Sequence, residues 1–247
     1  MAAPRPLRRP PITEALIDLR IATDTTIDAG RLQPLRERLA NEYAKVEERR
    51  ELRAEVRVQA GGAALPTVQD LGFNGLFFTS ADARRIAQFR RDGFTLNQLT
   101  PYPGAEALIA EALRLWGLYQ ETVHPPAITR VAFRYINSLQ LPYNHGDDFR
   151  RFLTAPADVP PEAPQSASTF FSRIVAHDDD DTVIITQQMD TSEPGEPTPT
   201  TLDLDVFHEG DIALPRGDLE RVLRRLRLLK NRVFFASLTD EAVDLFV

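Results

Sequence analysis

Residues 128–141 of the chain read ITRVAFRYINSLQL, and this stretch decides the fold. It is the longest segment in which apolar and polar side chains alternate with the two-residue period of a β-strand. The side chains expected on its two faces are Val131, Phe133 and Tyr135 on one, and Ala132, Arg134 and Ile136 on the other. The segment lies near the middle of 247 residues and follows a helical pattern closed by Pro125-Pro126. We therefore expect it to start a second half that pairs back onto the first.

The first half is predicted to run strand, helix, antiparallel strands, helix. The expected elements are a strand at 12–22, a helix at 30–51, a strand at 52–59, a loop at 60–71, short strands at 76–79 and 85–90, and a helix at 105–123. Asp92-Gly93 lies between the strand-like runs 86–91 and 94–99, and Asp-Gly in that position is the strongest short-range signal for a β-hairpin. Those two runs should be antiparallel neighbours.

The second half is predicted to repeat this order. After the strand at 128–141 we expect a turn at 142–145, a short helix at 147–153, strands at 170–176 and 182–189 joined through 177–181, an exposed loop at 190–200, a strand at 201–207, a helix at 216–232 and a last helical turn capped by Thr239. The predicted fold class is α+β, with an antiparallel sheet or two packed sheets and helices on one face. Element order alone suggests a duplicated β-α-β(3-4)-α unit, whose halves 1–127 and 128–247 pack as one compact unit.

The composition is that of a globular protein with a substantial core, since 43% of residues are hydrophobic and 26% charged. No apolar run approaches the roughly 18 residues of a membrane-spanning helix. The N-terminal MAAPRPLRRPP lacks the apolar stretch of a secretory signal, so we expect a cytoplasmic protein. The chain has no cysteine, which excludes disulfides, thiolate nucleophiles and cysteine-bound metal clusters.

The net charge of −7 is unevenly distributed along the chain. Residues 1–125 carry 17 basic and 16 acidic side chains, whereas the remainder carries 12 basic and 20 acidic ones. An acidic chain repels a phosphate backbone unless a local basic patch outweighs the overall field. Nucleic acid is therefore a less favoured partner than protein.

The motifs of common enzymes are missing from the sequence. It contains no serine-hydrolase elbow, phosphate-binding glycine loop, dinucleotide fingerprint or paired-histidine metal helix, and we expect no cofactor and no metal. His124, His145, His177 and His208 are far apart, and only His208-Glu209, just after Asp205, brings histidine near carboxylates. The aspartates at 178–181 lack the alternate spacing of a calcium loop and predict a solvated hairpin tip.

Two surfaces are candidates for function. The first is an outward strand face, expected to bind a polar ligand or a protein partner through Asp18, Arg20, Arg134, Asn137, Asp203 and Asp205. The alternative for this face is a structural set of cross-strand ion pairs, each contributing roughly 0.2 to 1 kcal/mol. The second is a basic patch made by Arg90 and Arg91 of the hairpin and by the exposed side of the 216–232 helix, with Arg221, Arg224, Arg225, Arg227, Lys230 and Arg232. Those helix cations could instead pair with the acidic second half.

Six motifs together carry a family resemblance. They are PPITEALID (10–18), QFRRDGF (88–94), YPG (102–104), RYIN (134–137), LDLDVF (202–207) and FFASLT (234–239). In this order they resemble a sporadically distributed family of bacterial and archaeal proteins of about 250 residues to which no activity is assigned. The resemblance implies one continuous unit and transfers no catalytic residue. Patchy distribution of this kind is associated with accessory, mobile-element and defence genes.

Three functions follow as hypotheses. The first is a non-enzymatic protein that binds another protein, as an accessory component of a mobile or defence-associated system. The second is a nucleic-acid-binding module that uses the hairpin at 90–94 and the helix at 216–232. The third is a metal-dependent enzyme built on Asp18, Asp203 and Asp205. The oligomeric state and the identity of a partner do not follow from the sequence.

Overall fold

The computed structural model describes residues 1–22, 24, 26–57, 65–143, 147–165, 167–191, 196–212 and 216–247. Its strands form a single antiparallel sheet in the order β2-β3-β4-β5-β1-β6-β9-β8-β7. The strands are β1 (Ile12–Arg20), β2 (Lys45–Arg57), β3 (Leu65–Thr79), β4 (Arg85–Arg90), β5 (Gly93–Leu99), β6 (Ile128–Leu141), β7 (Phe170–Asp178), β8 (Asp181–Met189) and β9 (Thr198–Ile212). The predicted α+β class is confirmed.

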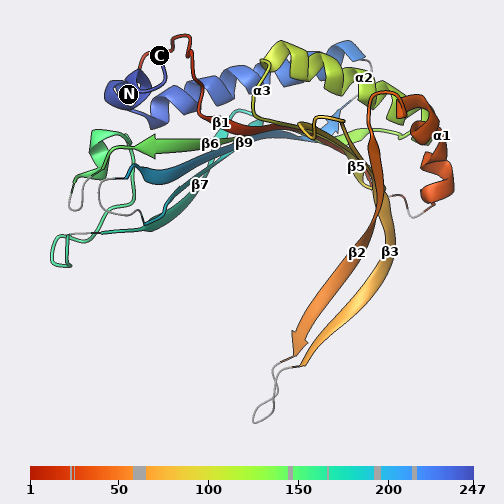
Figure 1. Cartoon of the computed structure of the whole chain (residues 1–247), viewed down its shortest axis with the longest axis horizontal. Coiled ribbons are helices and arrows are strands. Elements are labelled where there is room, and N and C mark those ends of the chain that lie inside the picture. Colours follow the sequence, from red (N-terminus) through yellow and green to blue (C-terminus); the bar gives the residue numbers. More distant parts are fainter. Residues whose placement is uncertain are drawn as a thin grey trace.

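The helices all lie on one side of the sheet (Figure 1). They are α1 (Ala29–Leu39), α2 (Ala105–Val123), α3 (Arg216–Ser237), α4 (Asp240–Asp244) and a 3₁₀ turn, η1 (Phe149–Arg151). The α3 helix packs on β6 and β9, and α2 packs on β1 and β5, so the core lies between these helices and the centre of the sheet. None of the helices in the described residues combines the length and apolar character needed to cross a bilayer.

The two halves of the chain meet at the centre of the sheet, where β1 pairs with β6. Each half places its first strand there and pairs it with its own last strand, β1 with β5 and β6 with β9. The strand order is therefore similar on both sides of the seam. The halves differ in detail, because the first contributes five strands and the second four. The duplication itself stays a prediction.

The central strand has the two faces that its alternation predicts. Val131, Phe133 and Tyr135 are buried against the helices, whereas Arg134 and Ile136 on the other face are only half-buried. The β4–β5 hairpin predicted from Asp92-Gly93 is also confirmed, although its turn is formed by Arg91 and Asp92, and Gly93 is the first residue of β5 and pairs with Arg90. Gly93 has φ 144°, and a Cβ there would lie 2.0 Å from the carbonyl oxygen of Leu19, so only glycine fits this approach of the hairpin to β1.

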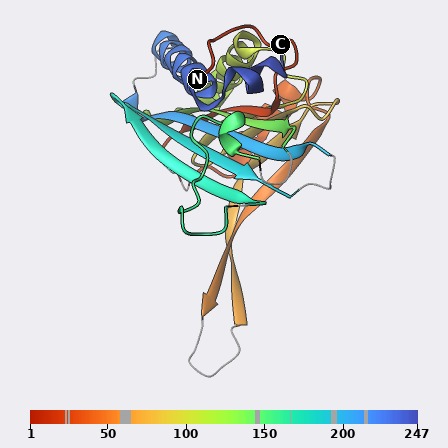
Figure 2. The same ribbon diagram turned by 90° about the vertical axis from the view of Figure 1, so that its left-hand side faces the viewer.

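The β2–β3 ribbon is the main departure from the predicted elements. The helix expected at 30–51 ends at Leu39, and residues from Lys45 onward form β2. The loop expected at 60–71 is strand from Leu65, while 58–64 lie outside the described residues. The arginine- and glutamate-rich 45–57 segment has good helix propensity, but antiparallel pairing with β3 along its whole length overrides that local preference. The ribbon projects away from the body of the sheet (Figure 2).

Smaller differences occur in the second half. The helix expected at 147–153 is only the 3₁₀ turn η1, and β9 begins at Thr198, inside the expected loop at 190–200. The β7–β8 hairpin is confirmed with a shorter turn, since Asp178 already pairs with Asp181. Thr239 caps α4 as predicted, its hydroxyl accepting a hydrogen bond from the Ala242 amide. His145, in the predicted turn at 142–145, lies outside the described residues.

The first prediction compares two phenylalanines in strands. Phe133 is 0% exposed, whereas Phe171 of β7 is 64% exposed. We expect Phe133→Ala to lower the free energy of unfolding by about 3 to 5 kcal/mol, because it removes a large core side chain. Phe171→Ala should change it by less than about 0.5 kcal/mol. Urea unfolding of both variants measures the difference, and similar losses would contradict the assignment of the two sides of the sheet.

Candidate functional site on the open face of the sheet

The face of the sheet opposite the helices, here termed the open face, carries most of the predicted ligand residues. Alternation along each strand places its side chains there, beginning with Leu16, Asp18 and Arg20 of β1. Polar side chains from the other strands on this face include Gln88, Arg90, Thr95, Asn97, Arg130, Arg134, Asp203 and Asp205. Figure 1 shows that α1, α2 and α3 all lie on the other side of the sheet and leave this face uncovered.

Asp18 is the centre of the open face. Its carboxylate accepts hydrogen bonds from Arg90 at 2.9 Å, from Arg20 at 2.7 Å and from the Thr95 hydroxyl at 2.5 Å. Arg130 of β6 donates a fourth at 3.3 Å. Strand pairing explains the convergence, because Asp18 lies directly opposite Thr95 on β5 and Ala132 on β6. The small Ala132 side chain leaves room for the guanidinium groups.

The network extends across β6 to β9. Arg130 also donates to Asp205 at 3.0 Å and its guanidinium carbon lies 4.2 Å from the centroid of the Phe207 ring. Arg134 donates to Asp203 at 2.8 Å. On the other side, Arg20 and Arg90 both pair with Asp92 at the β4–β5 turn. Each of these four arginines therefore has a carboxylate partner, and the face is close to neutral.

The pKa values of the two central carboxylates shift in opposite directions. Burial alone would raise the pKa of Asp18, but the charges of Arg90 and Arg20 and the Thr95 hydrogen bond outweigh it and lower the pKa below its ordinary value. Burial raises the pKa of Asp205, although Arg130 and Arg134 act against it. The fold thus favours the ionised form of Asp18 and disfavours that of Asp205.

The predicted metal-binding carboxylates lie on neighbouring strands but are separated by arginines. Asp18 and Asp205 both bind Arg130, and Asp203 binds Arg134. Within the part of the chain that the structure describes, no group of three histidine, aspartate or glutamate side chains is arranged to hold a metal ion. The arrangement that is present corresponds to the alternative weighed from the sequence, a set of cross-strand ion pairs.

Asn137 does not belong to the open face. It follows Ile136 on β6 and therefore points to the helix side, where it is 1% exposed and donates to the Leu202 carbonyl oxygen at 2.9 Å. Assigning it to the face of Arg134 was wrong, because residues three apart on a regular strand lie on opposite faces. It lines a cavity beneath α3.

The residues of the predicted basic patch lie in two separate places. Arg90 is buried on the open face, and Arg91 donates to the Phe73 carbonyl oxygen at 3.1 Å. The arginines of α3 lie on the helix side of the sheet (Figure 1). Their carboxylate partners are Asp218 for Arg221, Glu106 and Glu220 for Arg224, and Asp181 for Arg225. The sheet separates the two groups, so they do not form one continuous surface.

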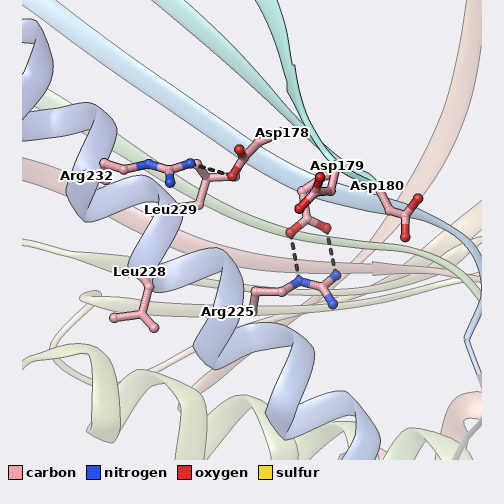
Figure 3. Close-up of a pocket in the computed structure, with 8 residues that line it drawn as sticks. Asp178, Asp179, Asp180, Arg225, Leu228, Leu229 and Arg232 are labelled. Atoms are coloured by element: carbon pink, nitrogen blue, oxygen red, sulfur yellow. Dashed lines mark hydrogen bonds and ion pairs between the residues drawn. The ribbon is translucent and has the colours of Figure 1, made fainter.

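The aspartates at 178–181 are only partly a solvated hairpin tip. Figure 3 shows the β7–β8 turn beside α3, where Arg225 binds the buried Asp181 at 2.7 Å and Arg232 binds Asp178. His208 completes the contact, with Nδ1 at 3.0 Å from Asp181. Asp179 and Asp180 are exposed. The paired aspartates fasten the hairpin to the helix.

Sequence reasoning misplaced one residue with unusual properties, Lys230. It was assigned to the exposed side of the 216–232 helix, but it is 8% exposed and lines the cavity that contains Asn137. The signal was present in the spacing, since Lys230 follows Leu219, Leu223 and Leu226 at intervals of three and four residues along the inward stripe of α3.

The open face also carries apolar side chains between its charges. Leu16, Phe77, Ile136, Ile184 and Phe207 are half-buried there, and Phe171 and Val175 are exposed on β7. β7 is an edge strand of the sheet. Exposed apolar groups next to arginines and an unpaired strand edge are typical of surfaces that bind proteins.

Comparison with known proteins does not assign the chain to a family. No protein-family model matches the sequence, and no curated protein is significantly similar to it. The resemblance carried by the six motifs therefore stays a prediction.

The second prediction uses the opposite pKa shifts of Asp18 and Asp205. Because the pKa of Asp18 is lowered in the fold, its charge stabilises the protein above the ordinary carboxyl pKa, and this is lost as the pH falls through the folded-state value. The pKa of Asp205 shifts in the opposite direction. Its contribution to the free energy of unfolding is therefore present in acid and lost as the pH rises. At pH 7, Asp18→Asn should cost about 3 to 5 kcal/mol, because Arg90 keeps a buried charge.

Asp205→Asn is the matched control. It should leave stability at pH 7 unchanged within about 0.5 kcal/mol, or raise it. Thermal unfolding of the wild type and both variants between pH 3 and pH 7 provides the comparison, and the deficit of Asp18→Asn should shrink toward the acid end. Equal deficits for the two variants at pH 7 would contradict the central role of Asp18.

Proposed function

We propose that this protein binds another protein through the open face of its sheet and the adjoining β2–β3 ribbon. The observation that carries the proposal is the mixed character of an uncovered face, in which paired arginines alternate with half-exposed apolar side chains. Arginine and aromatic residues are enriched at protein–protein interfaces. A surface that binds a nucleic-acid backbone instead needs cations that are free to neutralise phosphates.

The β2–β3 ribbon supports the same proposal. Among the described elements, β3 is the only one against which β2 packs extensively. An isolated two-stranded ribbon is marginally stable in water, so a ribbon of this length gains from contact with a partner. Leu52 and Leu71 are exposed on it, and Arg50 pairs with Asp70 at 2.8 Å. The ribbon projects at one end of the open face (Figure 1), where both surfaces can contact one partner.

The alternative of nucleic-acid binding has weaker support. The four arginines of the Asp18 network and those of the predicted patch on α3 are engaged by carboxylates, with Arg91 bound to a carbonyl oxygen. A phosphate would have to displace these partners, and the net charge of −7 adds repulsion. The metal-dependent alternative would require Asp18, Asp203 and Asp205 to exchange their arginines for a cation.

The third prediction tests the open face. A photo-crosslinking amino acid at position 171 should capture a specific protein from a lysate of the source organism, and the purified partner should then bind the wild-type protein directly. The double variant Phe171→Asp/Val175→Asp should weaken that binding at least about tenfold, since both side chains are exposed on the open face and an aspartate there removes an apolar contact. Titration calorimetry measures the affinities.

Leu228→Asp is the matched control, because Leu228 is 69% exposed but lies on α3, on the other side of the sheet. It should bind the partner like the wild type. Equal weakening by both changes would contradict the assignment of the interface.

Two other outcomes would favour the alternative functions. Co-purification of nuclease-sensitive material would favour nucleic-acid binding. Stabilisation by Mg²⁺ or Mn²⁺ that is abolished by Asp203→Asn/Asp205→Asn, with no protein partner captured, would favour the metal-dependent enzyme.

A further inference from the structure

Lys230 is an exception to the way this protein uses basic residues. Only two of its 29 basic side chains are lysines, Lys45 and Lys230. Lys45 is exposed and pairs with Glu47 at 3.1 Å. Lys230 is 8% exposed, on the inward stripe of α3. A chain that uses arginine almost everywhere therefore has lysine at a deeply buried position, where the difference between the two side chains has the greatest effect.

The Lys230 amine has no counter-charge. Its nitrogen lies 3.7 Å from the centroid of the Tyr135 ring, and no hydrogen bond or ion pair to it is present among the described residues. The charged groups facing it are Arg227 on α3, which pairs with Glu106, and Arg5 of the N-terminal segment, which pairs with Asp240 and Asp244. Burial, together with the charge of Arg227, lowers the pKa of Lys230 to about 7.

The amine lines a cavity of about 280 Å³ on the helix side of the sheet. Pro10, Pro11, Phe234 and Phe235 provide apolar walls, and no aspartate or glutamate is among the described residues that line it. Tyr102 and Tyr135 also line it, with their hydroxyl groups hydrogen-bonded to each other. Burial raises the pKa of Tyr102 to about 12, so its hydroxyl stays protonated at neutral pH and can donate a hydrogen bond.

A purely structural role does not account for this arrangement. A methionine or leucine would fill the space without the cost of moving an ammonium group out of bulk water. An arginine would stay charged, since a guanidinium is not deprotonated in proteins. Only lysine supplies a neutral amine at physiological pH, and a desolvated lysine beside another cation is the usual form of a nucleophilic amine.

We infer that Lys230 is the attachment site for a small aldehyde or ketone, which this cavity binds reversibly as an imine. The neutral amine attacks the carbonyl carbon, forming a C–N bond while the C=O π bond breaks, and one proton passes from the nitrogen to the former carbonyl oxygen, which gives a neutral carbinolamine. The C–O bond then breaks, the nitrogen loses its second proton and the departing hydroxyl takes up one proton, so that an imine and one water are formed and no oxidant or reductant is required. The Tyr102–Tyr135 hydroxyl pair can donate to the departing oxygen.

The fourth prediction is tested by reductive trapping. The protein is incubated with glyoxylate or with acetaldehyde, in the presence of sodium cyanoborohydride, and the modified residue is located by peptide mapping. At pH 7 about half of the Lys230 amine is neutral, against roughly one part in 2,500 for an ordinary lysine. We expect the adduct to form at Lys230 at least about tenfold faster than at Lys45, with a rate that levels off above pH 7. Comparable rates at the two lysines, or modification of Lys45 alone, would overturn the inference.

Two variants test whether the Lys230 amine itself is responsible for the adduct. Lys45→Arg should be trapped at Lys230 like the wild type, because it removes only the exposed lysine. Lys230→Met should lose the fast adduct while remaining folded. Because the folded-state pKa of Lys230 lies below that of the unfolded chain, the wild type should become more stable as the pH rises from 7 to about 10, and Lys230→Met should lack this gain. The same pH dependence in both proteins would show that Lys230 titrates as an ordinary lysine and would also overturn the inference.

Discussion

The antiparallel pairing of β1 with β6 is the contact on which the rest of the structure depends. It joins a five-stranded half and a four-stranded half into one sheet, and each strand of the pair also binds the last strand of its own half. The helices α2 and α3 pack next to each other over this seam. Ile17, Leu19, Val131 and Phe133 fill the layer between them and are fully or almost fully buried. On the opposite side the same strands bring Asp18 into the reach of Arg130.

Charged side chains are arranged differently on the open face and on the helix side of the sheet. On the open face each arginine of the network has a carboxylate within hydrogen-bonding distance, and Asp18 alone accepts from three of them. On the helix side the Lys230 amine has an aromatic ring beneath it, and none of the described residues that line its cavity is acidic. The first arrangement holds charges in place and suits a surface of fixed shape. The second leaves an amine free to give up its proton, which suits a chemical role.

The sequence was sufficient to predict an element where its local pattern agreed with the final packing. The alternation at 128–141, the Asp92-Gly93 turn and the apolar stripe of α2 all predicted the elements that form. It was insufficient where distant pairing decided the outcome, as in β2, whose charged residues suit a helix until β3 is placed beside them. The face of Asp18 was predicted, but not its burial, because two of the three converging arginines come from other strands, Arg90 from β4 and Arg130 from β6. Lys230 was misplaced because charge was given more weight than its position in the stripe.

The β1–β6 pairing has a consequence for synthesis of the chain on the ribosome. Asp18 and Arg130 are 112 residues apart in the sequence. The β1 strand can therefore pair with β5 before the ribosome has made β6. A partly made chain therefore presents the free side of β1 as an unpaired edge, and such edges pair with any complementary strand nearby. The β6 strand of another copy has the right side chains in the right order. Slow completion of the second half thus favours exchanged dimers, in which two chains complete each other's sheets.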